Sequence, residues 1–327
     1  MSSTEDIRIG VIGATGAVGT VTLALLAERG YTSVRALASS RSAGGRISFG
    51  ADELPVEETT AELLAAGDLD LCFFSVGTDT SRKLVPHALA GAAAVIDKSD
   101  AYRLADDVPL VVAGVNDEAL AGAQAASSGQ IVANPNCSAM QLACVLKPLH
   151  DTAGLTRVRL ATYQSMSGKG DEGMEQLRAT APAEGDLALD WDLIDDEFSE
   201  EWKLRAETRK ILDLPALLLS ATCVRVPVMV GHAQAVWVET EAELSPPAAR
   251  RALEAAPHVQ LEGFPTPGRA AGHDCVLAGR IRRDPAAERG LVIWVVNDNL
   301  RKGAALNAVQ IAEALIARNL IGAADRG

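Results

Sequence analysis

The first 135 residues alternate between short apolar runs and segments in which apolar residues have helical spacing. Residues 7–13 form an apolar run that ends in glycine, and residues 17–30 carry apolar side chains on one helical face. The alternation continues through residues 130–133, with a strand expected at 110–115 and a helix at 116–124. Strands that alternate with helices pair in parallel, so the pattern predicts a doubly wound α/β sheet.

The pattern changes after about residue 155, where longer apolar segments carry alternating polar positions. Such segments predict a largely antiparallel sheet, with few helices and with one face exposed or in an interface. They are residues 156–164, 217–228, 232–241, 275–284 and 290–298. Residues 301–320 have the spacing of an amphipathic helix, which we expect to pack against the first domain.

The length and this change of pattern predict two domains. A chain of 327 residues exceeds the usual size of one domain, which is about 100 to 200 residues. We expect an N-terminal domain over residues 1–135, completed by the C-terminal helix at 301–327. The second domain is expected to be α+β and to span residues 136–300.

Charge and hydropathy exclude several functional classes. The chain has 30 Lys and Arg against 43 Asp and Glu, a net charge of −13, which disfavours nucleic-acid binding. A small anion could still bind where basic residues gather. The acidic start and the absence of a long apolar run indicate a cytoplasmic protein with no membrane span. The acidic segment 184–202 is expected as a solvated loop, or as an arm that contacts another subunit.

The five cysteines suggest neither a disulfide framework nor a metal site. They are odd in number and contain no C-x-x-C pair. Four of them, Cys72, Cys144, Cys223 and Cys275, lie in apolar segments and are expected in the core. Cys137 does not fit this pattern.

A glycine-rich segment, GATGAVG at 13–19, follows the first expected strand and opens the first helix. At this position, backbone N–H groups and the positive end of a helix can hold the pyrophosphate of a dinucleotide. The spacing is G-x-x-G-x-x-G instead of G-x-G-x-x-G, which alone is a weak signal. Its position between a strand and a helix is what indicates a nucleotide site. Together with the alternating strands it predicts a Rossmann-type domain that binds a nucleotide cofactor. The alternative is a merely tight turn.

The end of the second expected strand favours NADP over NAD. An acidic residue there would bind the ribose 2′-hydroxyl of NAD, but the chain has Ser40, Arg41 and Ser42. A guanidinium group between hydroxyls suits a 2′-phosphate because it offers charge and several donors. The alternative is an exposed arginine in a polar loop.

Cys137 lies in ANPNCSAM, where a polar turn meets an expected helix. The helix dipole and the free N–H groups there stabilise a thiolate, which is a nucleophile. A thiolate beside a nicotinamide predicts attack on an aldehyde or an acyl group, with a thioester as intermediate. The alternative is a buried thiol at the start of a helix.

Ten motifs in order give the chain a specific resemblance over nearly its whole length. The motifs are GATGAVG, SSRSAG, VIDKSDAYR, ANPNCS, TYQSMSGKG, ETRKI, SATCVRVPV, GH, GRIRRD and DNLRKGAALNAVQIAE. With these motifs in this order, the chain resembles the aspartate-β-semialdehyde dehydrogenase family.

The resemblance implies roles for individual residues. Cys137 would form the acyl-thioester, Gln164 would position it and the substrate, and His232 would be the acid/base group. Four further residues would bind substrate: Arg225 its carboxylate, Glu207 its amino group, and Arg103 and Lys210 its phosphate. The implied NADP contacts are Gly13, Thr15, Gly16, Ala17, Val18, Ser40, Arg41, Ser42, Ser167, Gly168, Asn299 and Gln310.

The implied activity is the NADPH-dependent reduction of L-aspartyl 4-phosphate to L-aspartate 4-semialdehyde, with release of phosphate. This oxidoreductase would serve lysine, threonine and methionine synthesis and would form a homodimer or homotetramer through the second domain. One alternative is a related acyl-phosphate or acyl-CoA reductase, such as N-acetylglutamyl-phosphate reductase. Glu207 discriminates here, because a free substrate amine needs a carboxylate and an acylated amine does not. Another alternative is an inactive NADP-binding paralogue.

Several segments depart from the family pattern, among them FSVGTDTS at 74–81, which has fewer glycines. IDKSDAYR contains Lys98 and Asp100 where the family often has IDNSSAFR, and VVAGVN contains Gly114 where it usually has VVPEVN. GHAQ contains Gln234 where GHSE is common. None of these changes removes a proposed site residue.

Overall fold

The structure is a computed structural model that describes residues 7–125, 130–180 and 191–321. The chain divides into two compact units. The first consists of residues 1–135 and 304–327, and the second of residues 136–303.

The first unit is built on a seven-stranded sheet with the order β3-β4-β2-β1-β5-β6-β7. All neighbouring strands pair in parallel except β3 and β4, which form an antiparallel hairpin. The predicted parallel sheet is therefore confirmed, with the hairpin as an addition. The strands are β1 (Ile9–Ile12), β2 (Val34–Ala38), β3 (Arg46–Phe49), β4 (Asp52–Glu58), β5 (Leu71–Phe74), β6 (Ala94–Asp97) and β7 (Ile131–Ala133).

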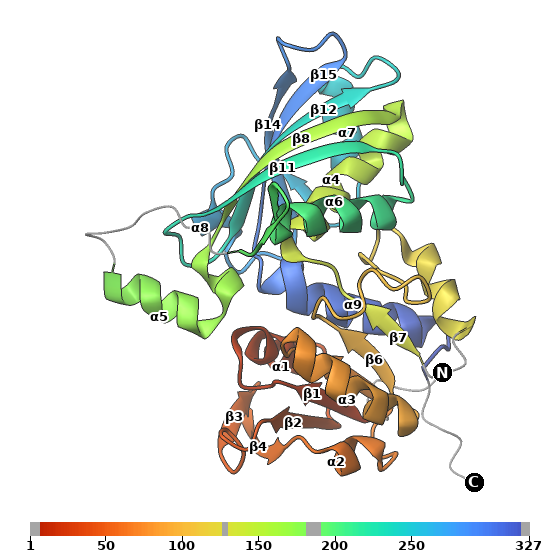
Figure 1. Cartoon of the computed structure of the whole chain (residues 1–327), viewed down its shortest axis with the longest axis vertical. Coiled ribbons are helices and arrows are strands. Elements are labelled where there is room, and N and C mark those ends of the chain that lie inside the picture. The colour runs from red at the N-terminus through yellow and green to blue at the C-terminus, as the bar shows by residue number, and fades with distance from the viewer. Residues whose placement is uncertain (1–6, 126–129, 181–190, 322–327) are drawn as a thin grey trace. The chain divides into compact units, whose positions relative to one another are not determined.

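Helices cover both faces of this sheet, as Figure 1 shows for the segments coloured red to orange. On one face, α1 and α9 share a hydrophobic core with alternate strand residues such as Ile9 and Val11. On the other, α2 packs against α3, which contacts β5 and β6. The helices are α1 (Ala17–Glu28), α2 (Ala61–Ala65), α3 (Thr78–Ala90), the 3-10 helix η2 (Asp117–Ala125) and α9 (Leu306–Ala317).

The strand expected at 110–115 is wrong, since this segment makes a single bridge, from Leu110 to Ala133, and then turns. Side-chain amides occupy the backbone groups that a neighbouring strand would need. Asn116 accepts from the N–H of Val112 at 2.8 Å and donates to the carbonyl of Leu110 at 2.9 Å. Asn307 accepts from the N–H of Ala113 at 2.9 Å.

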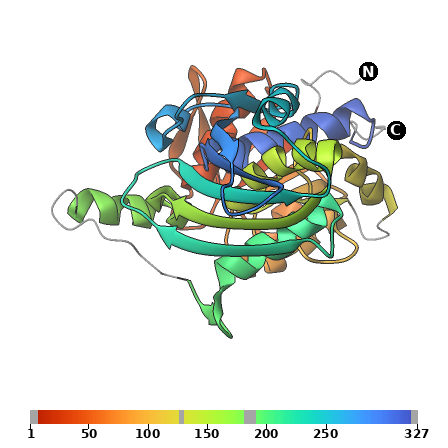
Figure 2. The ribbon, with the colours of Figure 1, turned by 90° about the horizontal axis from the view of Figure 1, so that it is seen from above.

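The second unit contains a six-stranded sheet with the order β11-β8-β12-β15-β14-β13. Three of its pairs are antiparallel, and two pairs, β8 with β11 and β13 with β14, are parallel. The prediction of a largely antiparallel sheet is confirmed, and Figure 2 shows the long strands β11, β8 and β12 side by side. The strands are β8 (Leu155–Gln164), β11 (Leu218–Arg225), β12 (His232–Thr240), β13 (Val259–Leu261), β14 (Val276–Arg283) and β15 (Gly290–Asn297).

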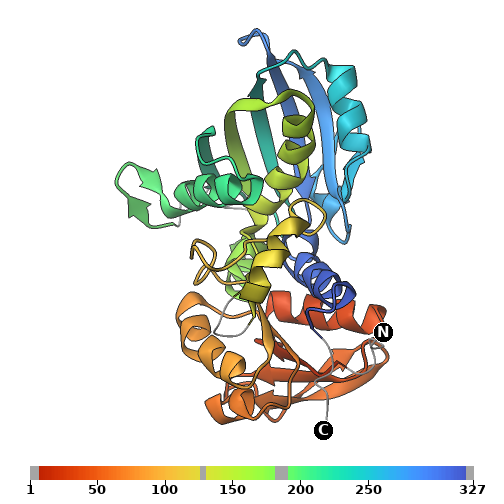
Figure 3. The ribbon, with the colours of Figure 1, turned by 90° about the vertical axis from the view of Figure 1, so that its right-hand side faces the viewer.

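Helices α4, α6 and α7 pack against this second sheet (Figure 3). The unit is thus α+β, as expected, with helices beside a mostly antiparallel sheet. The helices of the unit are α4 (Cys137–Ala153), α5 (Asp171–Thr180), α6 (Ser199–Leu212), α7 (Pro246–Glu254) and α8 (Pro267–Ala270), with the 3-10 turn η3 (Met166–Lys169).

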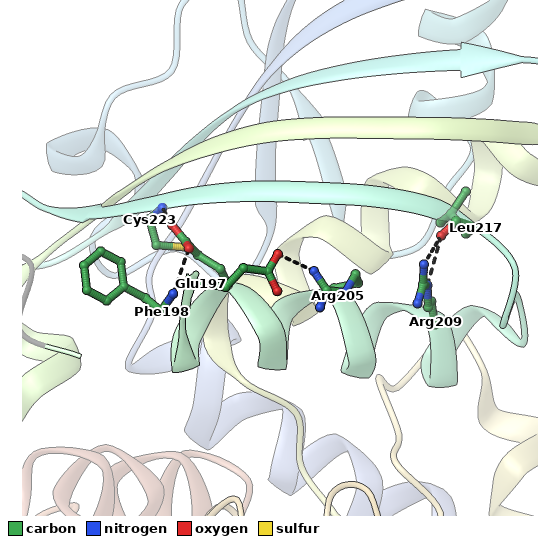
Figure 4. A network of polar contacts seen from close by, with 7 residues as sticks. Glu197, Phe198, Arg205, Arg209, Leu217 and Cys223 are labelled. Atoms are coloured by element: carbon green, nitrogen blue, oxygen red, sulfur yellow. Dashed lines mark hydrogen bonds and ion pairs between the residues drawn. The ribbon is translucent and has the colours of Figure 1, made fainter. Parts of the chain in front are cut away.

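The acidic segment is structured where it is described. Residues 184–190 lie outside the described residues, but the rest forms the hairpin β9 (Leu193–Ile194) and β10 (Glu197–Phe198) and begins α6. Residues 192–196 are exposed, as expected, but the expected solvated loop is wrong for the start of α6, where the carboxylate of Glu201 accepts from the backbone N–H groups of Phe198 and Cys223. Figure 4 shows two further contacts of α6. Arg205 forms an ion pair with Glu197, and the guanidinium of Arg209 donates to the carbonyl of Leu217.

The helix expected at 301–320 begins differently. Residues Arg301–Ala305 form a π-helical turn, and the α-helix starts at Leu306. The side chain of Asp298 accepts from the N–H groups of Leu300 and Arg301, each at 2.9 Å. The backbone carbonyl of Asp298 accepts from the N–H of Gly303 at 2.9 Å. Donor and acceptor are five residues apart, as in a π-helix, so the turn is wider than in an α-helix.

Candidate active site

Cys137 is the first residue of α4, as the sequence predicted. Asn136 caps the helix, and its side-chain oxygen accepts from the N–H of Ser138 at 2.8 Å and of Ala139 at 3.4 Å. Cys137 is partly exposed. In contrast, burial raises the pKa of the Cys72 and Cys223 thiols to about 12, so these remain protonated near neutral pH. Position thus singles out Cys137 as the candidate nucleophile.

Glu200, at the start of α6, connects the cap of α4 to the end of β8. One of its carboxylate oxygens accepts from the side-chain amide of Asn136 at 3.0 Å and from that of Gln164 at 2.9 Å. The carbonyl oxygen of the Gln164 side chain accepts from Thr162 at 3.2 Å. These contacts fix the orientation of the Gln164 amide and of the residue that precedes Cys137.

The two predicted substrate residues of α6 differ in their surroundings. Glu207 is buried, and its carboxylate accepts from the backbone N–H of Asn136 at 2.6 Å. Lys210 lies in the last turn of the helix and is partly exposed. Glu207 therefore lies next to the start of α4, where a substrate amine could share its carboxylate.

Three strand ends bring the other predicted groups together. β8 ends at Gln164, its parallel neighbour β11 ends at Arg225 opposite it, and the antiparallel β12 begins at His232. Gly168, in the turn after β8, borders both polar groups. A Cβ there would lie 3.1 Å from a guanidinium nitrogen of Arg225 and 3.1 Å from Cε1 of His232. Arg225 and His232 thus face one small space.

His232 is fully buried, and burial lowers its pKa to about 3, with the charge of Arg225 acting in the same direction. Its Nδ1 accepts from the backbone N–H of Ser165 at 3.0 Å. Because this N–H can only donate, the proton of the neutral imidazole is on Nε2. Among the described residues, Nε2 has no hydrogen-bond partner in the protein. The side chain therefore presents a donor on the side of Gly168.

Asn299 organises the loops around His232. Its side-chain oxygen accepts from the hydroxyls of Ser165 and Ser167, each at 3.0 Å, and from the N–H of Gly231 at 2.9 Å. Ser167 and Asn299, both predicted as cofactor contacts, are buried in this network. The network fixes the turn that carries Gly168.

Arg103, the other predicted phosphate-binding residue, lies in the first unit. Its guanidinium donates to the carbonyl of Asn134 at 3.0 Å and to that of Lys98 at 2.7 Å. It is buried. These bonds tie the guanidinium to the residue after β6 and to the residue after β7.

The glycine-rich turn has the geometry that a pyrophosphate requires. A Cβ on Gly13 would lie 2.3 Å from the carbonyl oxygen of Ser75, and one on Gly19 would lie 2.1 Å from that of Gly13, so neither position accepts a side chain. At Gly16 the nearest atom to such a Cβ would be 3.6 Å away. No side chain caps the start of α1. The residues therefore fit a nicotinamide dinucleotide, held by backbone N–H groups of the turn.

The remaining predicted cofactor residues of the first unit are partly or largely exposed. Thr15, Ala17 and Val18 belong to the turn and the start of α1. Ser40 and Arg41 are exposed after β2, and Ser42 is partly buried, its N–H donating to the carbonyl of Ser39 at 2.9 Å. Gln310 lies on α9 and is partly buried.

Other classes of site are not seen in the described parts of the chain. Within residues 7–125, 130–180 and 191–321, no group of three or more His, Cys, Asp or Glu side chains could hold a metal ion. The helices of those same segments are all too short or too polar to cross a membrane.

Sequence reasoning missed Glu200, Asn136, Ser165, Asn297 and Gly303. A Cβ on Gly303 would lie 3.1 Å from Cβ of Cys137 and 3.1 Å from the side-chain nitrogen of Asn297, so a larger residue beside the cysteine would require these neighbours to move by a few tenths of an ångström. The motif DNLRKG contains this glycine, which was the available signal. Glu200 gave none, because it lies in an acidic run that resembles a solvated surface.

Comparison with known proteins identifies the family. Residues 8–123 match the family described as semialdehyde dehydrogenase, NAD binding domain, and residues 146–302 match semialdehyde dehydrogenase, dimerisation domain. The chain is 42% identical to the aspartate-semialdehyde dehydrogenase of Corynebacterium glutamicum, over 94% of this chain and 99% of the relative.

Solved structures agree. Aspartate semialdehyde dehydrogenase II of Vibrio cholerae, complexed with ASA, superposes with a TM-score of 0.89 at 37% identity, over 96% of this chain and 99% of the other. The enzyme from Candida albicans with NADP gives a TM-score of 0.75 at 26% identity, over 96% and 99% of the two chains. The resemblance carried by the ordered motifs is confirmed: the chain belongs to the aspartate-semialdehyde dehydrogenase family.

Proposed function

We propose that this chain catalyses the NADPH-dependent reductive dephosphorylation of L-aspartyl 4-phosphate to L-aspartate 4-semialdehyde. The observation that supports this most is the arrangement of the second unit. Cys137 begins α4, Glu200 ties its cap to Gln164, and Arg225 and His232 border one space at the adjoining strand ends.

In this proposal the Cys137 thiolate attacks the acyl carbon, the carbon–oxygen bond to phosphate breaks, and a thioester forms. When bound, the nicotinamide would supply the hydride that reduces this thioester, after which the carbon–sulfur bond breaks and the aldehyde leaves. Nε2–H of His232 would donate to the oxygen that gains negative charge. The Gln164 amide, held by Glu200, would orient the acyl group.

Substrate recognition would use the fixed charges around this centre. Arg225 offers its guanidinium to the substrate carboxylate, and Glu207 offers its carboxylate to the amino group. Arg103 and Lys210 would hold the phosphate. A carboxylate on Arg225 would also offset the positive charge that lowers the pKa of His232.

The specific cofactor we propose is NADP. Arg41, between Ser40 and Ser42, is exposed where a ribose 2′-phosphate would be bound. No acidic residue occupies this short loop. The relative from Candida albicans was solved with NADP, which supports the same choice.

The division of labour between the units is also part of the proposal. Residues 1–135, completed by 301–327, would bind the cofactor, and residues 136–300 would carry catalysis and assembly. The match to a dimerisation domain supports a homodimer or a homotetramer. The cytoplasmic location expected from the sequence belongs to the same proposal.

The decisive test is the reverse reaction. Purified protein is mixed with aspartate semialdehyde and NADP, with and without phosphate, and NADPH is followed by its absorbance. The wild type should turn over only with phosphate, and Cys137→Ala should be inactive while still binding NADP. Turnover of N-acetylglutamate semialdehyde but not of aspartate semialdehyde would replace the proposed substrate by the acylated alternative. Failure with both aldehydes would contradict the proposed enzyme activity.

A further inference from the structure

Lys98 follows β6 directly, at the carboxyl edge of the first parallel sheet. Its ammonium nitrogen donates to the hydroxyl of Thr22 at 2.6 Å and to that of Ser75 at 2.8 Å. It lies 5.6 Å from the ring centroid of Phe73. Three elements, α1, β5 and β6, therefore meet at one cation.

Both hydroxyls connect this cation to the glycine-rich turn. Ser75 packs its carbonyl oxygen against Gly13, where an added Cβ would come within 2.3 Å. Thr22 donates its hydroxyl to the carbonyl of Val18 at 2.8 Å, in the first turn of α1. Ser75 and Thr22 thus each contact both the Lys98 ammonium and the backbone of the segment that would hold the pyrophosphate.

The charge of Lys98 is unfavourable in the protein alone. The start of α1 carries positive partial charge, and the ammonium bonds to Thr22 in the second turn of this helix, so the helix end weakly disfavours the cation. The Lys98 side chain is partly buried, and desolvation lowers its pKa to about 7, which the negative charge of Asp97 only partly opposes. The other groups that face the ammonium are the two hydroxyls and the Phe73 ring, and Arg103 donates to the Lys98 carbonyl.

We propose that Lys98 supplies, from behind the glycine-rich turn, a positive charge that strengthens binding of the cofactor pyrophosphate. The inference rests on the proposed nicotinamide cofactor but not on the aldehyde substrate. An anion at the turn removes the repulsion, so cation, helix end and ligand become mutually favourable. Lys98 acts by its charge, and its bonds to Ser75 and Thr22 hold the ammonium in place.

A proton linkage follows from the same geometry. The bound anion raises the pKa of Lys98, so cofactor binding takes up protons near neutral pH. The cation is present below the unbound pKa of about 7 and is lost above it. Cofactor affinity should therefore fall as pH rises through neutrality.

The experiment measures NADP dissociation constants by titration calorimetry, without substrate, at about pH 6.5 and about pH 8.5. Lys98→Met is compared with wild type, with Lys98→Arg, and with Lys83→Met, which removes an exposed lysine of α3. At the lower pH, Lys98→Met should bind about fivefold to tenfold more weakly, with an unchanged or higher melting temperature. Lys98→Arg should keep most of the affinity, and Lys83→Met all of it.

The pH dependence separates the charge from packing. The NADP phosphates titrate equally in every variant, so any difference in pH dependence comes from Lys98. Between the lower and the higher pH, the wild type should therefore lose more NADP affinity than Lys98→Met. Equal affinities of wild type and Lys98→Met, or equal pH dependences, would overturn the inference. A third result would also overturn it: Lys98→Arg loses as much NADP affinity as Lys98→Met, and both variants melt at a lower temperature than the wild type. A wild type that binds no NADP would instead contradict the proposed function.

Discussion

The side-chain amide of Gln164 donates to the carboxylate of Glu200 at 2.9 Å, although the two residues are 36 positions apart. The same oxygen accepts from Asn136. A single buried carboxylate therefore fixes two amides, one at the cap of α4 and one at the end of β8. Such a shared acceptor sets the orientation of the groups around Cys137.

Replacing Glu200 by alanine should lower kcat by about tenfold to a hundredfold, because two buried amides lose their acceptor and the geometry near Cys137 loosens. The KM for NADP should stay the same, since neither Asn136 nor Gln164, the two groups that Glu200 holds, is a predicted cofactor contact. Steady-state kinetics with aspartate semialdehyde check this. Glu197→Ala, which breaks the ion pair with Arg205, is the matched control and should keep kcat. Equal kcat values in the two variants would contradict a positioning role for Glu200.

Gly168→Ala should reduce kcat/KM by about tenfold or more with little change in melting temperature. The new Cβ would lie 3.1 Å from Arg225 and from His232, so one of these groups must shift. Gly263→Ala introduces the same methyl group where no atom lies within 4 Å and should behave as the wild type. Kinetics and thermal unfolding of both variants test the prediction, and an active Gly168→Ala would refute the assigned space.

His232 should make the protein less stable in acid. Its ordinary pKa of 6.5 falls to about 3 in the folded state, so the unfolded chain binds the extra proton. The contribution of His232 to the free energy of unfolding is therefore fully present above about pH 6.5. It falls by about 1.4 kcal/mol for each pH unit below that, down to about pH 3.

The contribution of His232 is separated by comparing urea unfolding of wild type and His232→Asn across this pH range. The variant should show a shallower pH dependence, while His273→Asn, which replaces a partly exposed histidine, should follow the wild type. Parallel curves for wild type and His232→Asn would mean that this histidine is not kept neutral by burial.

Arg41→Ala should raise the KM for NADP by about tenfold, because a charge-assisted contact with the 2′-phosphate is lost. The KM for NAD, which lacks this phosphate, should hardly change. Arg46→Ala on the neighbouring hairpin removes an exposed ion pair with Glu53 and serves as control. A similar loss for both cofactors after Arg41→Ala would reject selection of the 2′-phosphate.

The sequence by itself determined the local features. Alternating apolar runs and helical spacing specify the parallel sheet, because each element buries its own periodic face. The start of α4 at Cys137 was predictable for a similar reason, since the polar turn and the apolar positions at helical spacing after it are adjacent in the chain. The ordered motifs determined the family.

Only the tertiary structure decided which distant groups share a partner. Glu200 and Glu201 read as surface charge, yet they are buried because amides and N–H groups from β8, β11 and the α4 cap converge on them. The segment 110–115 reads as a strand, yet the amides of Asn116 and Asn307 take its backbone bonds. Periodicity records which side of an element is apolar, whereas a hydrogen bond depends on where a remote donor lies, and folding alone fixes that position.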